Sequence, residues 1–359
     1  MTTRTIAQAI AAAAVDFPLL GKITSDDLLQ VVEKELGHVD ILDTFAPYGN
    51  HQARAFGPEV ILHIVSGNTP HAALQSIIRG LLLKSRNLVK IPRAGLPEVE
   101  AFQQKLPPEL RDRIQITTEL SDTWIQQANA VIFFGSDESI HAIRKKIPTS
   151  VPFFAHGTRL SFGIIYDDPA FASTPGAARD ASLYDQQGCL SPHLFYIRES
   201  QPGDARRYAE KLAEEMARFQ KECPRGPLSV NEAAQIFHLR TSYRFRAVND
   251  PRVACWESPD SDAWTVLYED DAWFATSCLN RVVYVKPLPD DLAASLVPVQ
   301  HWLGAIGIWP CETPYAEKLQ HFSASRICAI GQMQNPPFTW HQEGRQTLAP
   351  LVRWVDFEG

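Results

Sequence analysis

The chain has 359 residues, 45% of them hydrophobic and 21% charged, and its net charge is −7. These values indicate a globular protein of about two domains and argue against a general affinity for nucleic acid or for an anionic membrane surface. The six cysteines are scattered without a C-x-x-C pair, and no apolar run is long enough to span a membrane. We therefore expect a cytoplasmic protein with reduced thiols and no integral membrane segment.

The first half of the sequence alternates predicted strands with predicted helices, which is typical of a parallel, doubly wound α/β sheet. Ser25 is the expected N-cap of the first helix, and Thr69, followed by Pro70, is the expected N-cap of the second. The predicted strands cover residues 59–66, 87–91, 130–134, 151–154 and 162–166. The predicted helices cover residues 26–36, 71–84, 97–106 and a segment from Gly135-Ser136 to about Lys146.

The second half starts near Tyr166 and contains the segment Asp185-Gln-Gln-Gly-Cys189-Leu-Ser-Pro-His193. Gly188 leaves room beside the sulfur of Cys189, and Pro192 opposes a continuous helix. This pattern favours a thiol on a tight turn, with the N–H of Cys189 available to a substrate oxygen. Taken alone, it fits a buried structural cysteine about as well as a catalytic one. An amphipathic helix over 204–222 and a β-rich stretch over 264–286 follow.

The usual phosphate-binding and metal-binding motifs are absent from the sequence. There is no G-x-G-x-x-G after a strand, no G-x-x-x-x-G-K-[ST], and no histidine or cysteine cluster that predicts a metal site. Two strand ends could still hold a dinucleotide. Gly135-Ser136 precedes a helix whose N–H groups would face a pyrophosphate, although it also fits a simple helix cap. Lys90 and Arg93 stand at the end of another predicted strand. The two cations could bind an anion there, or they could simply be solvated.

Several motifs, in this order and spacing, resemble the LuxC-type acyl-CoA reductases, a branch of the aldehyde dehydrogenase superfamily. The resemblance runs from about residue 55 to the C-terminus. It implies an aldehyde dehydrogenase-like α/β fold with a Rossmann-like cofactor domain over 1–160, a catalytic domain over 161–334 and a tail, 335–359, that packs back on the first domain. The motifs are Val65-Ser-Gly-Asn68-Thr-Pro70, Leu88-Val-Lys90-Ile-Pro92, Val131-Ile-Phe-Phe-Gly-Ser136, His156-Gly-Thr-Arg-Leu-Ser161, Gln186-Gln-Gly-Cys189-Leu-Ser-Pro192, Arg326-Ile-Cys-Ala-Ile-Gly331 and Trp340-His341.

The resemblance assigns roles to individual residues. Cys189 matches the nucleophile, and Asn68 matches the asparagine whose amide contributes to the oxyanion hole, although its residue type also suits a plain turn. Lys90 matches the lysine that binds the adenosine ribose, and Gly135-Ser136 matches the turn that meets the pyrophosphate. Arg93 stands where relatives that use NAD often carry a glutamate. A cation there suits a 2′-phosphate, so NADPH is expected rather than NADH.

One departure from the superfamily pattern predicts the direction of the reaction. Ala155 occupies the position of the glutamate that activates water in aldehyde-oxidising relatives. Without that base, an acyl-enzyme on Cys189 should persist until a hydride reduces it. We therefore expect reduction of an acyl-CoA, with a fatty acyl group, to the aldehyde. His156 or His193 could shuttle the proton, but both residues also fit structural roles.

Other interpretations stay open at this point. The chain could instead be an aldehyde dehydrogenase or an acyl-phosphate reductase of the same superfamily, or an inactive scaffold. The expected partner is the acyl-CoA substrate, with no nucleic acid; a homo-oligomer or a complex with acyl-transfer enzymes is also compatible with the sequence. The sequence leaves open the acyl chain length and whether the donor is CoA or a carrier protein.

Overall fold

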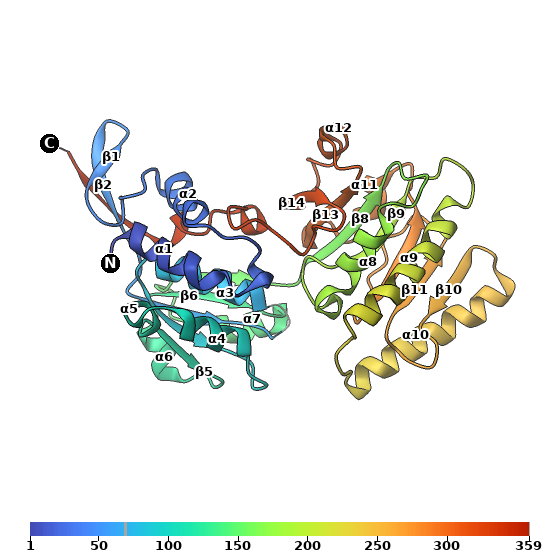
Figure 1. Ribbon diagram of the computed structural model, residues 1–359, viewed down its shortest axis with the longest axis horizontal. Helices are drawn as coiled ribbons and strands as arrows, with labels where there is room; N and C mark the ends of the chain where they lie inside the picture. Colours follow the sequence, from blue (N-terminus) through green and yellow to red (C-terminus); the bar gives the residue numbers. More distant parts are fainter. Residues whose placement is uncertain (68–69, 359) are drawn as a thin grey trace. The chain divides into compact units, whose positions relative to one another are not determined.

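The computed structural model describes residues 1–67 and 70–358 and divides the chain into two compact units (Figure 1). Unit 1 contains residues 1–158 and 337–359, and unit 2 contains residues 159–336. The sequence places the corresponding boundaries at 160/161 and 334/335. Which unit binds cofactor and which carries out catalysis stays a prediction.

Unit 1 is built around a five-stranded parallel sheet with the strand order β5-β4-β3-β6-β7. The chain runs outward from β3 to β5, returns to the centre, and continues with β6 and β7. The order therefore reverses between β3 and β6, and ligands of open α/β sheets bind at the carboxyl ends of strands beside such a reversal. The strands are β3 (Val60–Ile64), β4 (Arg86–Lys90), β5 (Ile114–Thr117), β6 (Ala130–Phe134) and β7 (Phe153–His156).

Helices cover both faces of this sheet because its strands are apolar on both sides. One face, which includes Ile61 and Val89, packs against α1 to α4. The other face, which includes Leu62 and Val131, packs against α6 and α7. The helices are α1 (Thr3–Ala14), α2 (Ser25–Leu36), α3 (Pro70–Leu82), α4 (Pro97–Lys105), α5 (Pro108–Arg111), α6 (Asp122–Gln127) and α7 (Asp137–Arg144).

The C-terminal segment returns to unit 1 and completes a small antiparallel sheet. Strand β15 (Arg353–Phe357) pairs with β2 (His51–Phe56), which pairs on its other side with β1 (Ala46–Tyr48). Figure 1 shows this red strand beside the blue β1–β2 hairpin. Phe338 and Leu348, from the same returning segment, are buried in the core formed by α1 to α4.

Unit 2 contains a seven-stranded sheet of order β10-β11-β12-β9-β8-β13-β14, parallel except for the edge strand β10. Its strands are β8 (Leu160–Ile165), β9 (Pro192–Ile197), β10 (Val253–Glu257), β11 (Thr265–Glu269), β12 (Val282–Pro287), β13 (Leu303–Trp309) and β14 (Arg326–Ala329). Its helices are α8 (Thr174–Ser182), α9 (Asp204–Glu222), α10 (Val230–Asn249), α11 (Leu292–Leu296) and α12 (Thr313–Glu317). The predicted α/β fold is confirmed.

Some predicted element ends need correction. The N-cap of α2 is Thr24 rather than Ser25, because the Thr24 side chain accepts from the Asp27 N–H while the Asp27 carboxylate accepts from the Thr24 N–H. Helix α7 ends at Arg144 instead of near Lys146, and β7 and β8 begin at 153 and 160 instead of 151 and 162. The predicted N-cap Thr69 lies outside the described residues.

Within residues 1–67 and 70–358, no helix combines the length and the apolar character needed to cross a bilayer. In the same part of the chain, no group of three or more His, Cys, Asp or Glu side chains is placed to hold a metal ion.

Candidate active site

Cys189 lies in unit 2, on the turn that leads into β9. The N–H of Ser191 donates to the carbonyl oxygen of Gly188 at 3.0 Å, which closes a four-residue turn with Cys189 at its second position. Cys189 is exposed, whereas Gly188, Leu190 and Ser191 are buried. The turn therefore presents one cysteine at the surface of an otherwise buried segment.

Ser161 fastens this turn to the neighbouring strands. Its Oγ donates to the carbonyl oxygen of Cys189 at 2.9 Å and accepts from the N–H of Ala305 in β13 at 2.9 Å. A Cβ added at Gly304 would lie 3.0 Å from Ser161 Oγ and 3.3 Å from the Cys189 carbonyl oxygen, so a side chain there would press on the turn. Cys189 thus lies at the amino edge of three central strands, β8, β9 and β13.

Two backbone segments near the Cys189 turn adopt the left-handed conformation. Residues 184–186 have φ angles of 54°, 52° and 63°, and residues 279–281 have φ angles of 65°, 58° and 63°. None of the six is a glycine, so each costs about 1–3 kcal/mol of backbone strain that surrounding contacts must offset. We call these two segments together the left-handed clamp. They comprise Tyr184, Asp185, Gln186, Leu279, Asn280 and Arg281.

The two halves of the left-handed clamp are joined by an ion pair between the buried Arg281 and the partly exposed Asp185. Arg281 Nε and Nη2 lie 2.9 and 2.8 Å from Asp185 Oδ1, and Arg281 is 2% exposed. Its Nη1 also donates to Gln220 Oε1 at 2.7 Å and to the carbonyl oxygen of Cys223 at 2.9 Å. The ring of Phe219 lies 5.5 Å from the guanidinium carbon. This arginine is thus held by charge, by hydrogen bonds and by an aromatic face.

Gln186 ties the clamp to the strand that follows Cys189. Its side-chain oxygen accepts from the N–H of Val282 at 2.9 Å, and its side-chain nitrogen donates to the carbonyl oxygen of Pro192 at 2.9 Å. The next residue, Gln187, donates to Asn280 Oδ1 at 2.9 Å. The Cys189 turn is therefore anchored to the clamp before the cysteine and, through Pro192, after it.

His193 lies in the core of the same sheet. It is buried, its Nδ1 accepts from the N–H of Ser277 at 3.1 Å, and burial lowers the pKa of its ring to about 4. A neutral ring with one nitrogen already engaged is typical of a structural histidine. We therefore assign no proton transfer to His193.

The predicted cofactor residues lie at the carboxyl edge of the unit 1 sheet. Lys90 is the last residue of β4 and pairs in register with Ile64 of β3, while Arg93 follows in an exposed turn. Both are on the side of the sheet where ligands of this fold bind. Asn68, the predicted oxyanion donor, lies outside the described residues.

Gly135 and Ser136 connect β6 to α7 at this edge. A Cβ at Gly135 would lie 2.7 Å from a ring carbon of Phe133, so only glycine allows the backbone to pass this ring closely. Ser136 is exposed and is the N-cap of α7, with its Oγ accepting from the N–H of Ser139 at 3.3 Å. The start of α7 therefore combines a tight glycine turn with a hydroxyl at the positive end of a helix.

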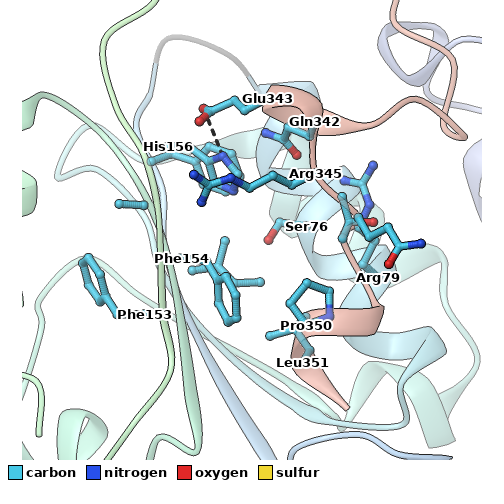
Figure 2. A pocket seen from close by; sticks show the side chains of 15 residues that line it. Ser76, Arg79, Phe153, Phe154, His156, Gln342, Glu343, Arg345, Pro350 and Leu351 are labelled. Carbon is cyan, nitrogen blue, oxygen red and sulfur yellow. Dashed lines mark hydrogen bonds and ion pairs between the residues drawn. The ribbon is translucent and has the colours of Figure 1, made fainter. Parts of the chain in front are cut away.

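His156, the last residue of β7, is paired within unit 1. Its Nδ1 lies 3.1 Å from Glu343 Oε1 (Figure 2). Its ring stacks on Phe134, with the ring centroids 4.6 Å apart. His156 and Glu343 line a pocket of about 220 Å³. The pocket lies between α3, the ends of β6 and β7, and the returning segment 342–351. Ala155 lines the same pocket. Ala155 precedes His156 in β7, and its match to the superfamily glutamate stays a prediction.

Sequence reasoning missed most of the residues that hold these sites. Ser161 and Gln186 lie inside motifs that resemble the LuxC family. The sequence therefore marked both residues as part of a family-like segment but did not show which atoms they contact. Asp185 gave no sign of its partner Arg281, because the two residues are far apart in the sequence. Glu343 was missed for the same reason: it pairs with a histidine 187 residues earlier.

A sequence model described as acyl-CoA reductase (LuxC) matches residues 9–354. The chain belongs to the acyl-CoA reductase (LuxC) family. This confirms the resemblance found in the sequence and identifies an oxidoreductase of the acyl-reductase class.

Curated relatives of this LuxC-family chain are named for an acyl–protein thioester. A long-chain acyl-protein thioester reductase of Aliivibrio fischeri is 26% identical over 354 residues, covering 92% of this chain and 70% of the relative. The protein of that name from Photorhabdus luminescens is 27% identical over 349 residues, with the same coverage of 92% and 70%. These names point to protein-bound acyl groups, whereas the sequence predicted acyl-CoA.

Solved structures similar to this LuxC-family chain include aldehyde dehydrogenases. A betaine aldehyde dehydrogenase of Staphylococcus aureus in complex with NAD⁺ aligns with a TM-score of 0.67 at 14% identity, covering 99% of this chain and 83% of that one. A succinic semialdehyde dehydrogenase of Streptococcus pyogenes in complex with NADP⁺ gives 0.67 at 12% identity, covering 98% and 90%. At these identities the likeness establishes the aldehyde dehydrogenase-like fold alone.

Proposed function

We propose that this chain reduces an acyl thioester to the aldehyde, with NADPH as hydride donor and Cys189 as nucleophile. The observation that supports this proposal best is an exposed cysteine on a firmly anchored turn in a LuxC-family chain. An exposed thiol can ionise and reach a substrate carbonyl, whereas burial keeps a thiol inert. Burial raises the pKa of Cys255 and of Cys328 to about 12, which makes both poor nucleophiles.

In the proposed reaction, the Cys189 thiolate bonds to the acyl carbon and the donor leaves as a thiol after taking up a proton. When bound, NADPH supplies a hydride to the acyl carbon of this thioester. Collapse of the resulting thiohemiacetal breaks the carbon–sulfur bond, releases the aldehyde and regenerates the thiolate. The net balance is thioester, NADPH and a proton to aldehyde, thiol and NADP⁺. The Cys189 N–H and the Asn68 amide are assigned to the oxyanion in both tetrahedral species.

The residues at the carboxyl edge of the unit 1 sheet fit a dinucleotide phosphate. Lys90 and the exposed Arg93 supply two cations, of which Arg93 favours NADPH by matching a 2′-phosphate. Ser136 and the first turn of α7 supply N–H donors for the pyrophosphate. Asp137 and Glu138, in the first turn of α7, carry charge that opposes an anion there. Asp137 Oδ1 accepts from the Thr158 N–H at 3.1 Å, which directs this carboxylate toward residue 158.

The acyl donor is either CoA or a protein thiol. The names of the curated relatives favour a protein-bound acyl group, while the sequence prediction was acyl-CoA. Rates of aldehyde formation from matched acyl-CoA and acyl-protein donors, measured with NADPH and with NADH, separate the two donors and the two cofactors.

The decisive experiment is intact-mass analysis without NADPH. We expect a panel of acyl-CoAs or acyl-proteins to add one acyl mass to the peptide that contains Cys189, and addition of NADPH to remove it as aldehyde. Cys189→Ala should not be labelled, whereas Cys311→Ala, which removes another exposed cysteine, should be labelled like the wild type. Labelling of Cys311 or Cys223, or no labelling with either donor class, would refute the mechanism.

A further inference from the structure

The pocket lined by Ala155 and His156 has room for a small ligand. Its volume of about 220 Å³ exceeds the cavity of about 150 Å³ in which an engineered apolar site binds benzene. Much of its wall is apolar, formed by the sheet on one side and the returning C-terminal segment on the other (Figure 2). The apolar lining residues are Ile132, Phe134, Phe153, Phe154, Pro350 and Leu351.

One wall of this pocket carries a buried cation, Arg79, from the third turn of α3. Arg79 is 3% exposed, and its Nε has no hydrogen-bond partner among residues 1–67 and 70–358. Its Nη2 makes only a long hydrogen bond, 3.4 Å, to the carbonyl oxygen of Phe338, whose ring lies 4.8 Å from the guanidinium carbon. Among the described residues, no carboxylate oxygen lies within 4.0 Å of the Arg79 nitrogens. This charge is therefore incompletely satisfied.

Glu35, the acid that acts electrostatically on Arg79 from a longer distance, already accepts hydrogen bonds from other groups. Glu35 interacts electrostatically with Arg79, but one of its oxygens accepts from the N–H groups of Thr347, Leu348 and Ala349 at 2.7, 2.5 and 3.2 Å. The other oxygen accepts from the Thr347 hydroxyl at 3.0 Å. Burial lowers the pKa of Arg79 to about 10, which still leaves the guanidinium charged at neutral pH.

A second cation and an acid complete the polar part of the lining. Arg345 is exposed, lines the pocket, and in the view of Figure 2 extends toward His156. Glu343 opposes an anion, and its Oε1 lies 3.1 Å from His156 Nδ1, on the side of the lining away from Arg79. The lining thus combines two guanidinium groups with aromatic and aliphatic walls.

We infer that this pocket binds a small carboxylic acid, with the carboxylate against Arg79 and the apolar body against Phe134 and Phe154. Guanidinium N–H donors match a planar carboxylate, and an unpartnered buried Nε is completed by such an acceptor. The apolar walls favour an acid with a hydrocarbon body over a strongly hydrated ion such as phosphate. The inference goes beyond the proposed reduction and needs no role for Cys189.

Calorimetric titration of the full chain with benzoate and octanoate tests this inference, with benzamide and octanamide as uncharged analogues of similar shape. The acids should bind at least about tenfold more tightly than the amides, because a charged hydrogen bond to Arg79 is lost in the amides. Arg79→Met should weaken acid binding by about tenfold or more and leave amide binding within about twofold. Arg345→Gln, at an exposed position, should cause a smaller loss.

Two further variants keep the test interpretable. Arg86→Met removes an exposed arginine at the opposite, amino end of the sheet and should bind benzoate like the wild type. Gln346→Trp, at an exposed lining residue, should block the pocket without removing Arg79 if Arg79→Met does not fold. Equal affinity for acids and amides, or acid binding that survives both Arg79→Met and Gln346→Trp, would overturn the inference. Cys189→Ser should bind benzoate normally, so this test fails or succeeds independently of the proposed reaction.

Discussion

Asp185→Ala should destabilise unit 2 and slow acylation of Cys189, because it removes the counter-ion of a buried arginine. Breaking a buried ion pair costs about 3–5 kcal/mol when the remaining charge has no other partner. Arg281 keeps Gln220 and Cys223 as acceptors, and the Asp185 side chain is 29% exposed, so water can partly replace it. We therefore expect a loss of about 2–3 kcal/mol in the free energy of unfolding. For a unit of residues 159–336, this corresponds to a lower Tm by roughly 4–12 °C.

The matched control is Glu214→Ala, which removes the acid of the Lys211–Glu214 pair on α9. Those side chains are 48% and 56% exposed, so the expected loss is only about 0–1 kcal/mol. Stability is measured by urea unfolding and calorimetry, and acylation by the rate at which acyl-CoA or acyl-protein labels Cys189. If the left-handed clamp positions the Cys189 turn, Asp185→Ala should slow labelling by about tenfold or more well below its melting temperature.

Two results would refute this reasoning. A stability loss no larger than that of Glu214→Ala would mean that the Asp185–Arg281 pair contributes little to the fold. A large stability loss with an unchanged labelling rate would mean that the clamp supports the unit without positioning the cysteine. Alkylation of the exposed Cys311 serves as an internal standard and should be the same in all three proteins.

Four other substitutions test separate parts of the proposal. Asn68→Ala should lower kcat by about 10²–10³-fold in steady-state assays, and a change of only a few-fold would make Asn68 a plain turn residue. Arg93→Glu should weaken NADPH binding far more than NADH binding in fluorescence titrations; equal losses would show that Arg93 points away from the 2′-phosphate. Ala155→Glu should produce free acid without NADPH, by a general-base effect of about 10²–10⁴-fold, unless the wild type already hydrolyses its acyl-enzyme with another base such as His156. Burial lowers the pKa of His193 in the folded chain to about 4, below the ordinary value of about 6.5, so the unfolded chain binds a proton more readily between these two values. The free energy of unfolding is therefore unaffected by this residue above pH 6.5 and falls as the pH falls toward 4, by at most about 3.4 kcal/mol. His193→Gln should therefore flatten the dependence of urea stability on pH in that window, and an unchanged profile would contradict the assigned burial effect.

The sheet of unit 1 could be predicted because its strands carry a local signal. Residues 130–134 are an apolar, β-rich run bounded by Asn129 and Gly135, and the structure has β6 over Ala130–Phe134. Helix ends were less certain, since Thr24 and Ser25 are both good caps and only the contact with Asp27 decides between them. Local propensity thus located the elements, while side-chain contacts set their ends.

Residues of the candidate site could be predicted from the sequence only where the side chain itself suggests a chemical role. Cys189 stood out because its motif resembles that of the LuxC family, since the local pattern alone fits a structural cysteine about as well as a catalytic one. The left-handed clamp could not be predicted, because Tyr184 and Leu279 have no preference for a positive φ and the strain is offset by contacts between distant segments. Arg79 likewise looked like one polar position on an apolar helix, and its burial depends on the returning segment that contains Phe338.

The return of the C-terminal segment has a consequence for how the chain is made. Unit 2 is one continuous stretch, so all of its strands have been synthesised before Phe338, Leu348 and β15 appear. Until then β2 has one unpaired edge, and the core around α1 to α4 lacks two of its buried side chains. Unit 1 therefore cannot be completed before the last part of the chain is available. Until the returning segment is in place, the open edge of β2 is a surface that a chaperone specific for unpaired strands could bind.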